Sequence, residues 1–285
     1  MQGLVWLLAA GLAVAAGVAL VVGVGLAVAY PNLPEIVGLT DYRPKLPLRV
    51  ISADGVMLGE FGEERRIYTP IAQIPRRMQE AVLAIEDARF YRHSGVDYVG
   101  VLRAGLAQFN RAKSQGASTI TMQVARNFYL STEKTFTRKI YEILLALKIE
   151  QQLSKPQILE IYMNQIFLGQ RAYGFAAASE IYFGKPLAEV TVAEAAMLAG
   201  LPQAPSAYNP VSNPARATRR QQHIIDRMES NGFITEEQAE TARKETLKLR
   251  VPTETAVHAE YVAESVRQLI FSQYGAETTT RGLNV

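Results

Sequence analysis

The chain has 285 residues and no cysteine, and its 30 Lys and Arg residues against 27 Asp and Glu residues give a formal net charge of +3. This length allows one large domain or two small ones. Without cysteine there is no disulfide, no thiolate metal site and no cysteine nucleophile. A charge this small does not indicate nucleic acid as a partner, and it is equally compatible with an anionic substrate or a membrane surface.

The N-terminus is apolar, and the first charged side chain is Glu35. The run Leu4–Ala29 exceeds the roughly 20 residues that span a bilayer, and it predicts a transmembrane helix within residues 1–30. The alternative is a cleaved signal peptide with a cleavage site at residues 27–29, although signal cores run only about 7–15 residues. Basic residues follow the run and none precedes it, so the positive-inside rule alone places the C-terminal side in the cytoplasm.

After this apolar run the sequence predicts a proline-rich segment, a hairpin and then mostly helices. Residues 31–47 contain four prolines and are expected to form an extended, helix-poor stalk. Leu48–Tyr68 alternates apolar and polar residues around an Asp-Gly pair, which predicts a small β-hairpin. From Met78 onward the pattern is helical, and a strand-like tail begins at Thr278. Capping boxes open three apolar runs, at Ser154–Gln157, Thr191–Glu194 and Thr235–Gln238.

The segment from Glu86 to Gly95 is the first candidate for chemistry. Glu86 follows an apolar helical face, where a carboxylate loses solvation, its pKa rises and it becomes a usable acid or base. The competing interpretation is a helix-end carboxylate paired with Arg89 or Arg92. His93 alone is typical of a hydrogen-bonded structural histidine, and no HExxH metal spacing occurs.

Three further clusters follow in the chain. Residues 116–127 gather hydroxyls, an amide and an arginine that suit sugar hydroxyls and phosphate oxygens, or alternatively form a Ser/Thr-rich helix cap. Lys134, Arg138 and Glu142 share one helical stripe, typical either of solvated salt bridges or of a diphosphate site with or without a divalent metal. Residues 158–169 by themselves indicate only a helix.

In this order the clusters resemble the peptidoglycan glycosyltransferase domain of class A penicillin-binding proteins, most closely the 1A type. The family pattern E-D-x-x-F-x-x-H-x-G matches residues 86–95, and G-x-S-T-I-T-x-Q matches residues 116–123. R-K-x-x-E matches residues 138–142, I-L-x-x-Y-x-N matches residues 158–164, and Ala199–Ser206 is also of this kind. The chain has Met122, Arg126 and Lys134 where the family usually has Gln, Lys and Arg.

The resemblance implies a mainly α, lysozyme-like glycosyltransferase domain over residues 48–225 and a helical linker over residues 226–285. The family's companion transpeptidase is not expected in this chain, which lacks the S-x-N and K-T-G motifs and resembles a truncation before that domain. The implied reaction polymerises lipid II into β-1,4 glycan strands, with inversion and release of undecaprenyl diphosphate. Glu86 is then the catalytic base, and Glu142 is the second catalytic carboxylate, which organises the diphosphate directly or through Mg²⁺ or Mn²⁺. The implied substrate-binding residues are Asp87, Phe90, His93, Ser118, Thr119, Thr121, Gln123, Arg126, Asn127, Lys134, Arg138, Lys139 and Asn164.

The same resemblance implies lipid II, the growing glycan strand, the cytoplasmic membrane and other cell-wall synthesis proteins as partners. Because lipid II is used on the outer face, the domain is expected on the periplasmic side of a single-pass inner-membrane protein, against the charge rule. Two rival functions remain. A lysozyme-like muramidase would not need the cations around Glu142, and a membrane-anchored cell-wall binding module would need neither carboxylate.

Overall fold

The computed structural model describes residues 30–40, 44–62, 64–102, 118–130, 135–250 and 259–285, together with positions 6, 11, 13, 16, 17, 20 and 23. Among these residues we find no helix with the length and apolar character needed to cross a membrane. Most of the predicted transmembrane run Leu4–Ala29 lies outside the described residues.

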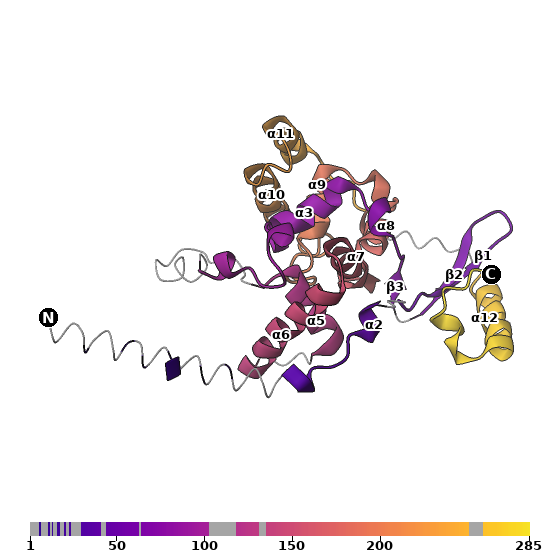
Figure 1. Cartoon of the computed structure of the whole chain (residues 1–285). Helices are drawn as coiled ribbons and strands as arrows, with labels where there is room; N and C mark the ends of the chain where they lie inside the picture. The colour runs from indigo at the N-terminus through magenta and orange to yellow at the C-terminus, as the bar shows by residue number, and fades with distance from the viewer. Residues whose placement is uncertain are drawn as a thin grey trace.

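Packed helices form the main body of the described chain (Figure 1). Helices α3, α9 and α10 all pack on one another, and α5 packs on both α6 and α7. The predicted mainly α fold is therefore confirmed. In chain order the helices of the body are α3 (Arg76–Glu86), α5 (Ile120–Tyr129), α6 (Phe136–Gln152), α7 (Lys155–Gln165), α8 (Phe175–Phe183), α9 (Val192–Ala199), α10 (Pro214–Ser230) and α11 (Glu236–Lys244).

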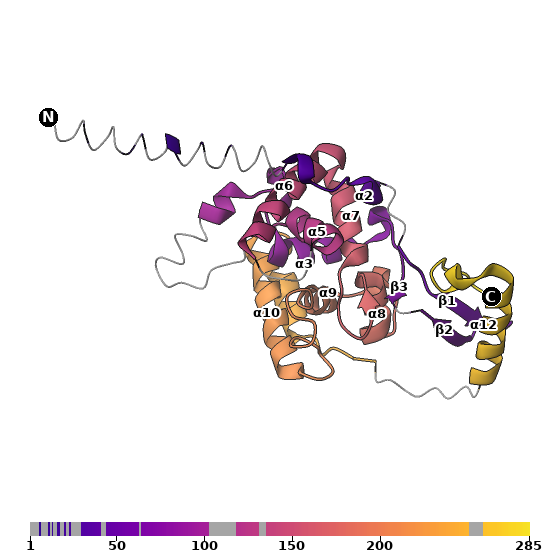
Figure 2. The ribbon, with the colours of Figure 1, turned by 90° about the horizontal axis from the view of Figure 1, so that it is seen from below.

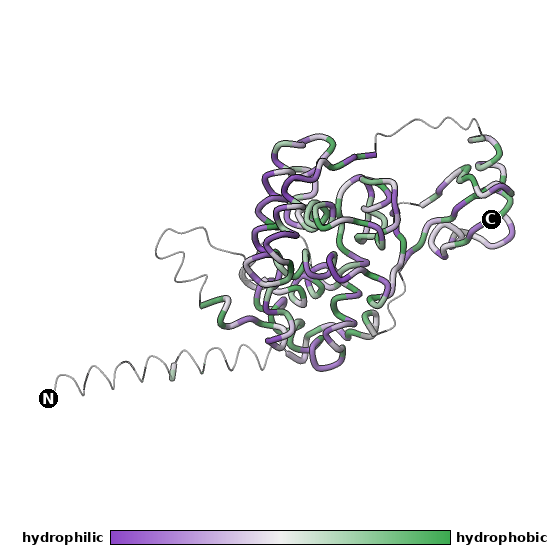
Figure 3. The backbone as a smooth tube through the Cα atoms, turned by 90° about the horizontal axis from the view of Figure 1, so that it is seen from above, coloured by the Kyte–Doolittle hydropathy of each residue, from purple (hydrophilic) through white to green (hydrophobic). Residues whose placement is uncertain are grey.

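A single large core joins these helices, and Figure 3 shows hydrophobic residues on the segments that meet inside the body. The core also takes in the segment before the first strand, which contains the 3₁₀ turn η1 (Tyr30–Asn32) and the short helix α2 (Val37–Thr40). Leu33, Ile36 and Leu39 are buried there. The extended stalk predicted from the prolines is wrong for this part, because apolar residues at every third position form a stripe that packs on the core.

A small lobe lies beside the helical body (Figure 2). Strand β1 (Leu48–Ile51) pairs antiparallel with β2 (Met57–Phe61), as the alternating pattern predicts. The C-terminal tail runs parallel to β1, and the amide of Ile51 donates to the carbonyl of Val285 at 2.7 Å. Helix α12 (Glu260–Tyr274) covers this lobe by packing on both strands.

Two predicted boundaries shift in the structure. The hairpin ends at Phe61, because β3 (Arg65–Arg66) pairs in parallel with β4 (Ala172–Tyr173) in the helical body. The end of the main domain predicted at residue 225 falls inside α10, which continues to Ser230 and then packs on α11. Residues 226–285 therefore divide between the body and the small lobe.

The three predicted capping boxes all form, at the starts of α7, α9 and α11. The backbone amide of Ser154 donates to Gln157 Oε1 at 2.9 Å, and that of Thr191 donates to Glu194 Oε2 at 2.7 Å. Each box satisfies amides that the first turn of a helix leaves without partners. These local signals therefore decide where three of the helices begin.

The turn after α3 packs directly on α6. A 3₁₀ turn, η3 (Phe90–Arg92), follows α3, and the chain then passes through Gly95 with φ of +88°. A Cβ on Gly95 would lie 3.0 Å from backbone atoms of Ala146 in α6. Glycine is needed here both for the left-handed backbone and for the close approach.

Gly95→Ala should therefore destabilise the protein more than Gly232→Ala does. Gly232 also has a positive φ, of +72°, but nothing lies within 4 Å of a Cβ built there. The control variant should lose only the left-handed strain of about 1–2 kcal/mol, whereas the Gly95 variant should lose this and the packing on α6. Urea unfolding of both variants measures the difference, and equal losses would contradict the close packing.

Candidate active site

Glu86 is the last residue of α3 and is partly buried. Gln123 Nε2 donates a hydrogen bond to Glu86 Oε2 at 2.7 Å. Burial raises the pKa of Glu86 above its usual value, and the negative charge of Asp87 adds to this rise. The Gln123 hydrogen bond and the positive charges of Arg220 and Arg126 oppose it. The raised pKa makes this carboxylate a stronger proton acceptor than an exposed one.

Helix α5 presents Gln123 to Glu86 because its N-terminus is fastened to the turn after α3. The backbone amide of Ile120 donates to Asp87 Oδ2 at 3.1 Å, and Thr119 Oγ1 donates to the Gly95 carbonyl at 2.6 Å. The Thr119 hydroxyl also accepts from an amide in the first turn of α5 and caps the helix. The predicted binding residues Asp87 and Thr119 are thus used to place α5.

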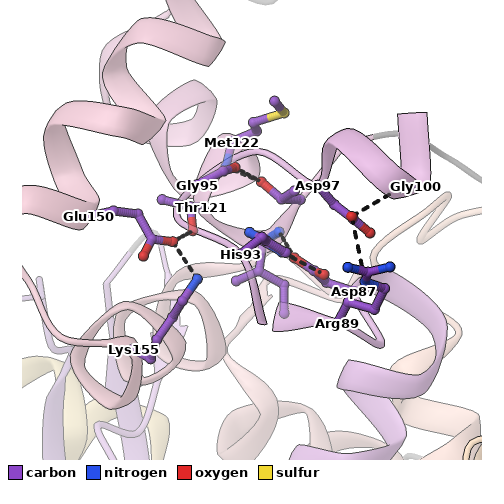
Figure 4. Close-up of polar contacts among 12 residues, drawn as sticks. Asp87, Arg89, His93, Gly95, Asp97, Gly100, Thr121, Met122, Glu150 and Lys155 are labelled. Atoms are coloured by element: carbon purple, nitrogen blue, oxygen red, sulfur yellow. Dashed lines mark hydrogen bonds and ion pairs between the residues drawn. The ribbon is translucent and has the colours of Figure 1, made fainter. Parts of the chain in front are cut away.

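His93 and Asp87 form a buried pair in this turn (Figure 4). His93 Nε2 lies 3.0 Å from each carboxylate oxygen of Asp87, and the His93 ring meets the Phe90 ring edge-on. This is the hydrogen-bonded structural histidine that the segment alone indicates. Contact of either residue with substrate stays a prediction.

Thr121 and Phe90 contact a partly buried ion pair between Glu150 on α6 and Lys155 on α7. Glu150 Oε1 accepts from the Thr121 hydroxyl at 2.6 Å and from Lys155 Nζ at 2.6 Å (Figure 4). Lys155 Nζ also lies 4.2 Å from the centre of the Phe90 ring, a cation–π contact. Both residues that the family resemblance assigns to substrate are therefore occupied in joining α5, α6, α7 and η3.

Asn164 joins α7 to the segment that precedes α3. Its Oδ1 accepts from the Thr69 amide at 2.8 Å, and its Nδ2 donates to the Thr69 carbonyl at 2.8 Å. Nδ2 also donates to the Glu160 carbonyl at 2.9 Å. Because both ends of this buried amide have backbone partners, the structure gives Asn164 a structural role, and its predicted contact with substrate stays a prediction.

A second cluster surrounds Glu142 on α6, whose side chain is 1% exposed. Lys139 Nζ lies 2.9 Å from Glu142 Oε2, and Arg138 Nε lies 3.5 Å from Glu142 Oε1. Lys139 Nζ also donates to Ser118 Oγ at 2.8 Å, which brings the start of α5 to the cluster. Two cations beside one buried carboxylate suit the binding of a phosphate group.

The donor set at Glu142 does not fit a resident divalent cation. Both carboxylate oxygens already face a cationic side chain. Within the described ranges there is no group of three or more His, Asp or Glu side chains placed to hold a metal ion. Mg²⁺ favours six oxygen ligands, so no chemical step is assigned to a cation here, and the predicted Mg²⁺ or Mn²⁺ stays a prediction.

The remaining predicted site residues differ in what the structure says of them. Arg126 is partly buried on α5, and its positive charge acts on Glu86. Asn127, the next residue, is exposed. Lys134 lies outside the described residues.

Two residues near Glu86 are missing from the predicted site. Tyr162, fully buried on α7, donates its hydroxyl to Gln123 Oε1 at 3.4 Å, and burial together with the Glu86 charge raises its pKa. Tyr162 lies within a matched family block, so a sequence signal for it existed. Arg220 lies in a basic stretch of α10, and only the packing of α10 on α3 brings its charge to Glu86.

Comparison with known proteins places this site in a family context. The transglycosylase family model matches residues 54–229. The chain is 54% identical over 260 residues to penicillin-binding protein 1A of Neisseria meningitidis serogroup A, covering 90% of this chain and 33% of that protein. It is 46% identical over 257 residues to penicillin-binding protein 1A of Escherichia coli strain K12, covering 90% of this chain and 30% of that protein.

A solved structure is also similar. The crystal structure of penicillin-binding protein 1A from Haemophilus influenzae aligns with a TM-score of 0.50 and 30% sequence identity. The alignment covers 85% of this chain and 27% of that one. The chain thus spans about a third of the length of the curated relatives it matches.

Glu86→Gln should raise the thermal stability of the protein at pH 8. Because burial raises the pKa of Glu86, the folded state favours the protonated acid, and the parent loses stability as pH rises through that pKa. Glutamine is neutral at every pH and can still accept from Gln123. The gain should disappear below about pH 4, under the ordinary pKa of glutamate.

Thermal melts of the parent and the variant between pH 4 and pH 8 measure this gain, in which each 1 kcal/mol corresponds to about 2–4 °C in Tm. Glu80→Gln is the control on the same helix, because Glu80 pairs with Arg76 at 2.7 Å and its removal should bring no gain. An unchanged or lower Tm for Glu86→Gln at pH 8 would contradict the idea that burying the ionised Glu86 carboxylate destabilises the parent.

Proposed function

Because the chain belongs to the transglycosylase family, we propose that it is a peptidoglycan glycosyltransferase that joins lipid II units into β-1,4 glycan strands. The observation that carries the proposal is the partly buried Glu86, whose pKa is raised and whose carboxylate is oriented by Gln123. The basic cluster around Glu142 supports transfer from a diphosphate. The two relatives named above, both penicillin-binding protein 1A, support the same substrate class.

In the proposed reaction Glu86 acts as the general base. Its carboxylate accepts the proton of the acceptor sugar's 4-hydroxyl, and that oxygen attacks the anomeric carbon of the donor. The bond from this carbon to the diphosphate oxygen breaks, and the diphosphate leaves with the bonding electrons. Attack on the face opposite the leaving group turns an α-linked donor into a β-1,4 bond. The Gln123 hydrogen bond keeps the carboxylate in place for this step.

The departing diphosphate would be stabilised by the cations on α5 and α6. Lys139 and Arg138 already converge on the buried Glu142, and Arg126 lies near Glu86. Positive groups held where negative charge develops lower the barrier to bond breaking. The role of Glu142 is then to hold Lys139 and Arg138 in position, since its two oxygens face them.

We also propose that the protein works at the bacterial inner membrane, anchored by Leu4–Ala29, with its catalytic domain on the extracytoplasmic side. The lipid-linked donor and the released lipid diphosphate both remain in the membrane. Large apolar side chains beyond the turn after α3 support this placement, because Tyr98 is 68% exposed and Leu102 is 66% exposed. The growing glycan strand and other cell-wall synthesis proteins are the remaining proposed partners.

Incubation of the chain with lipid II should yield glycan strands on a gel, and Glu86→Gln should yield none. Replacing a catalytic base by its isosteric amide removes proton transfer, a loss of about 10²–10⁴-fold. Polymer in equal amounts from both proteins would remove Glu86 from the mechanism. Cleavage of existing glycan without polymer would favour a muramidase, and glycan binding without either reaction would favour a binding module.

Lys139→Met should lower polymerisation by about 10²-fold, the effect of removing one group that stabilises developing negative charge. Lys148→Met is the control on the same helix, because Lys148 Nζ donates to the Pro34 carbonyl at 3.0 Å and is not part of the cluster. Equal losses of activity in both variants would show that the loss comes from impaired folding and not from the cluster.

The predicted divalent cation is tested in the same assay. Activity that is lost with EDTA and restored by Mg²⁺ or Mn²⁺ would support it.

A further inference from the structure

The block Ala199–Ser206, to which the proposed reaction gives no role, spans the end of α9 and the start of the loop between α9 and α10. It leads to Tyr208 and then into α10, which carries Arg220. Arg220 is partly buried, and its Nε is a buried nitrogen without a hydrogen-bond partner in the structure. Its positive charge nevertheless acts on the carboxylate of Glu86. Two contacts of other kinds restrain this side chain.

The ring of Tyr208 supplies one support. The guanidinium carbon of Arg220 lies 5.5 Å from the centre of this ring, and that of Arg216 lies 5.2 Å from the same centre. The Tyr208 ring belongs to a turn that is held in place by hydrogen bonds. The Tyr208 amide donates to the Ala204 carbonyl at 3.0 Å, and the buried Asn209 accepts from the Val211 amide at 2.9 Å.

Gly200 supplies the other support. A Cβ at Gly200 would lie 2.9 Å from Cγ of Arg220 and 3.2 Å from the carbonyl oxygen of Met197. The φ of Gly200 is −77°, which any residue adopts. The position therefore needs glycine for space and not for backbone conformation, and the space is filled by the stem of Arg220.

We propose that Gly200 and Tyr208 are positioning residues that hold the Arg220 guanidinium beside the catalytic carboxylate without neutralising it. A carboxylate partner would also restrain Arg220, but it would cancel the charge that Glu86 experiences. An aromatic face restrains a guanidinium and leaves its charge intact. This inference rests on the proposed role of Glu86 as the base.

The charges around Glu86 define the expected pH effect. Besides Arg220 on α10, Glu86 faces Gln123 and Arg126 on α5, Asp87 in the following turn and the hydroxyl of Tyr162 on α7. The base is active when deprotonated, so the rate falls as pH drops through its pKa. Losing the positive charge of Arg220 raises that pKa, and the acid limb of the rate profile then moves to higher pH.

The test measures the pH dependence of kcat/KM for lipid II polymerisation by the full chain. Arg220→Gln and Tyr208→Leu should each move the acid limb upward by about 0.5–1 pH unit, a fraction of what a directly contacting charge produces. Tyr208→Phe keeps the ring and should leave the limb in place. Arg216→Gln should also leave it in place, because Arg216 shares the ring but is not among the charges that act on Glu86.

Double variants separate positioning from general packing. Adding Tyr208→Leu to the Arg220→Gln variant should not shift the acid limb of the pH profile any further than Arg220→Gln alone does. Gly200→Ala should lower kcat/KM in the parent but not in Arg220→Ala, which has no Cγ for the new methyl group to meet. Thermal melts confirm that each variant is folded.

The inference would be overturned if Tyr208→Leu left the acid limb of the pH profile in place. It would also be overturned if Tyr208→Leu shifted that limb by the same amount in the parent and in the Arg220→Gln variant. The parent and Glu86→Gln run in the same assay. A parent that makes no polymer would overturn the proposed function, whereas an active parent with unmoved limbs in the loop variants would overturn only the positioning role.

Discussion

The site depends on one interaction, the hydrogen bond that the Ile120 amide donates to the buried carboxylate of Asp87. This contact ties the N-terminus of α5 to the residue that follows Glu86. Since α5 is a rigid helix, fixing its first turn also fixes Gln123 one turn later, where its amide meets Glu86. His93 Nε2 lies 3.0 Å from both oxygens of the same carboxylate and also restrains it. A misplaced Asp87 would therefore misplace both the base and the group that orients it.

Opposing electrostatic demands explain the arrangement of the rest of the site. A base needs burial to raise its proton affinity, and a departing diphosphate needs positive charge nearby. The structure separates the two demands. Glu86 is partly buried at the end of α3, accepts a neutral hydrogen bond and experiences the positive charges of Arg220 and Arg126, whereas Lys139 and Arg138 lie directly against Glu142 on α6. Burial thus dominates at Glu86, and ion pairing dominates at Glu142.

Sequence reasoning placed Glu86 and Glu142 in two distinct polar clusters, because each lies in a short motif whose spacing is local, and their catalytic roles stay predictions. It did not distinguish residues that face a substrate from those that hold helices together. Thr121 and Asn164 both carry family-matched polar groups, yet their partners are Glu150 and the backbone of Thr69. These partners come from other helices and segments, and no local pattern reveals them.

The sequence by itself determined the helical class, the hairpin, the starts of three helices and the candidate base. The first three follow from periodicity and capping within a few residues, and the candidate base follows from the resemblance of its motif to a known family. Only the tertiary structure decided that Arg220 acts on Glu86 and that Gly200 and Tyr208 surround Arg220. The reason is physical: the charge at a site depends on which helices pack together, and the packing of α10 on α3 is a property of the whole core.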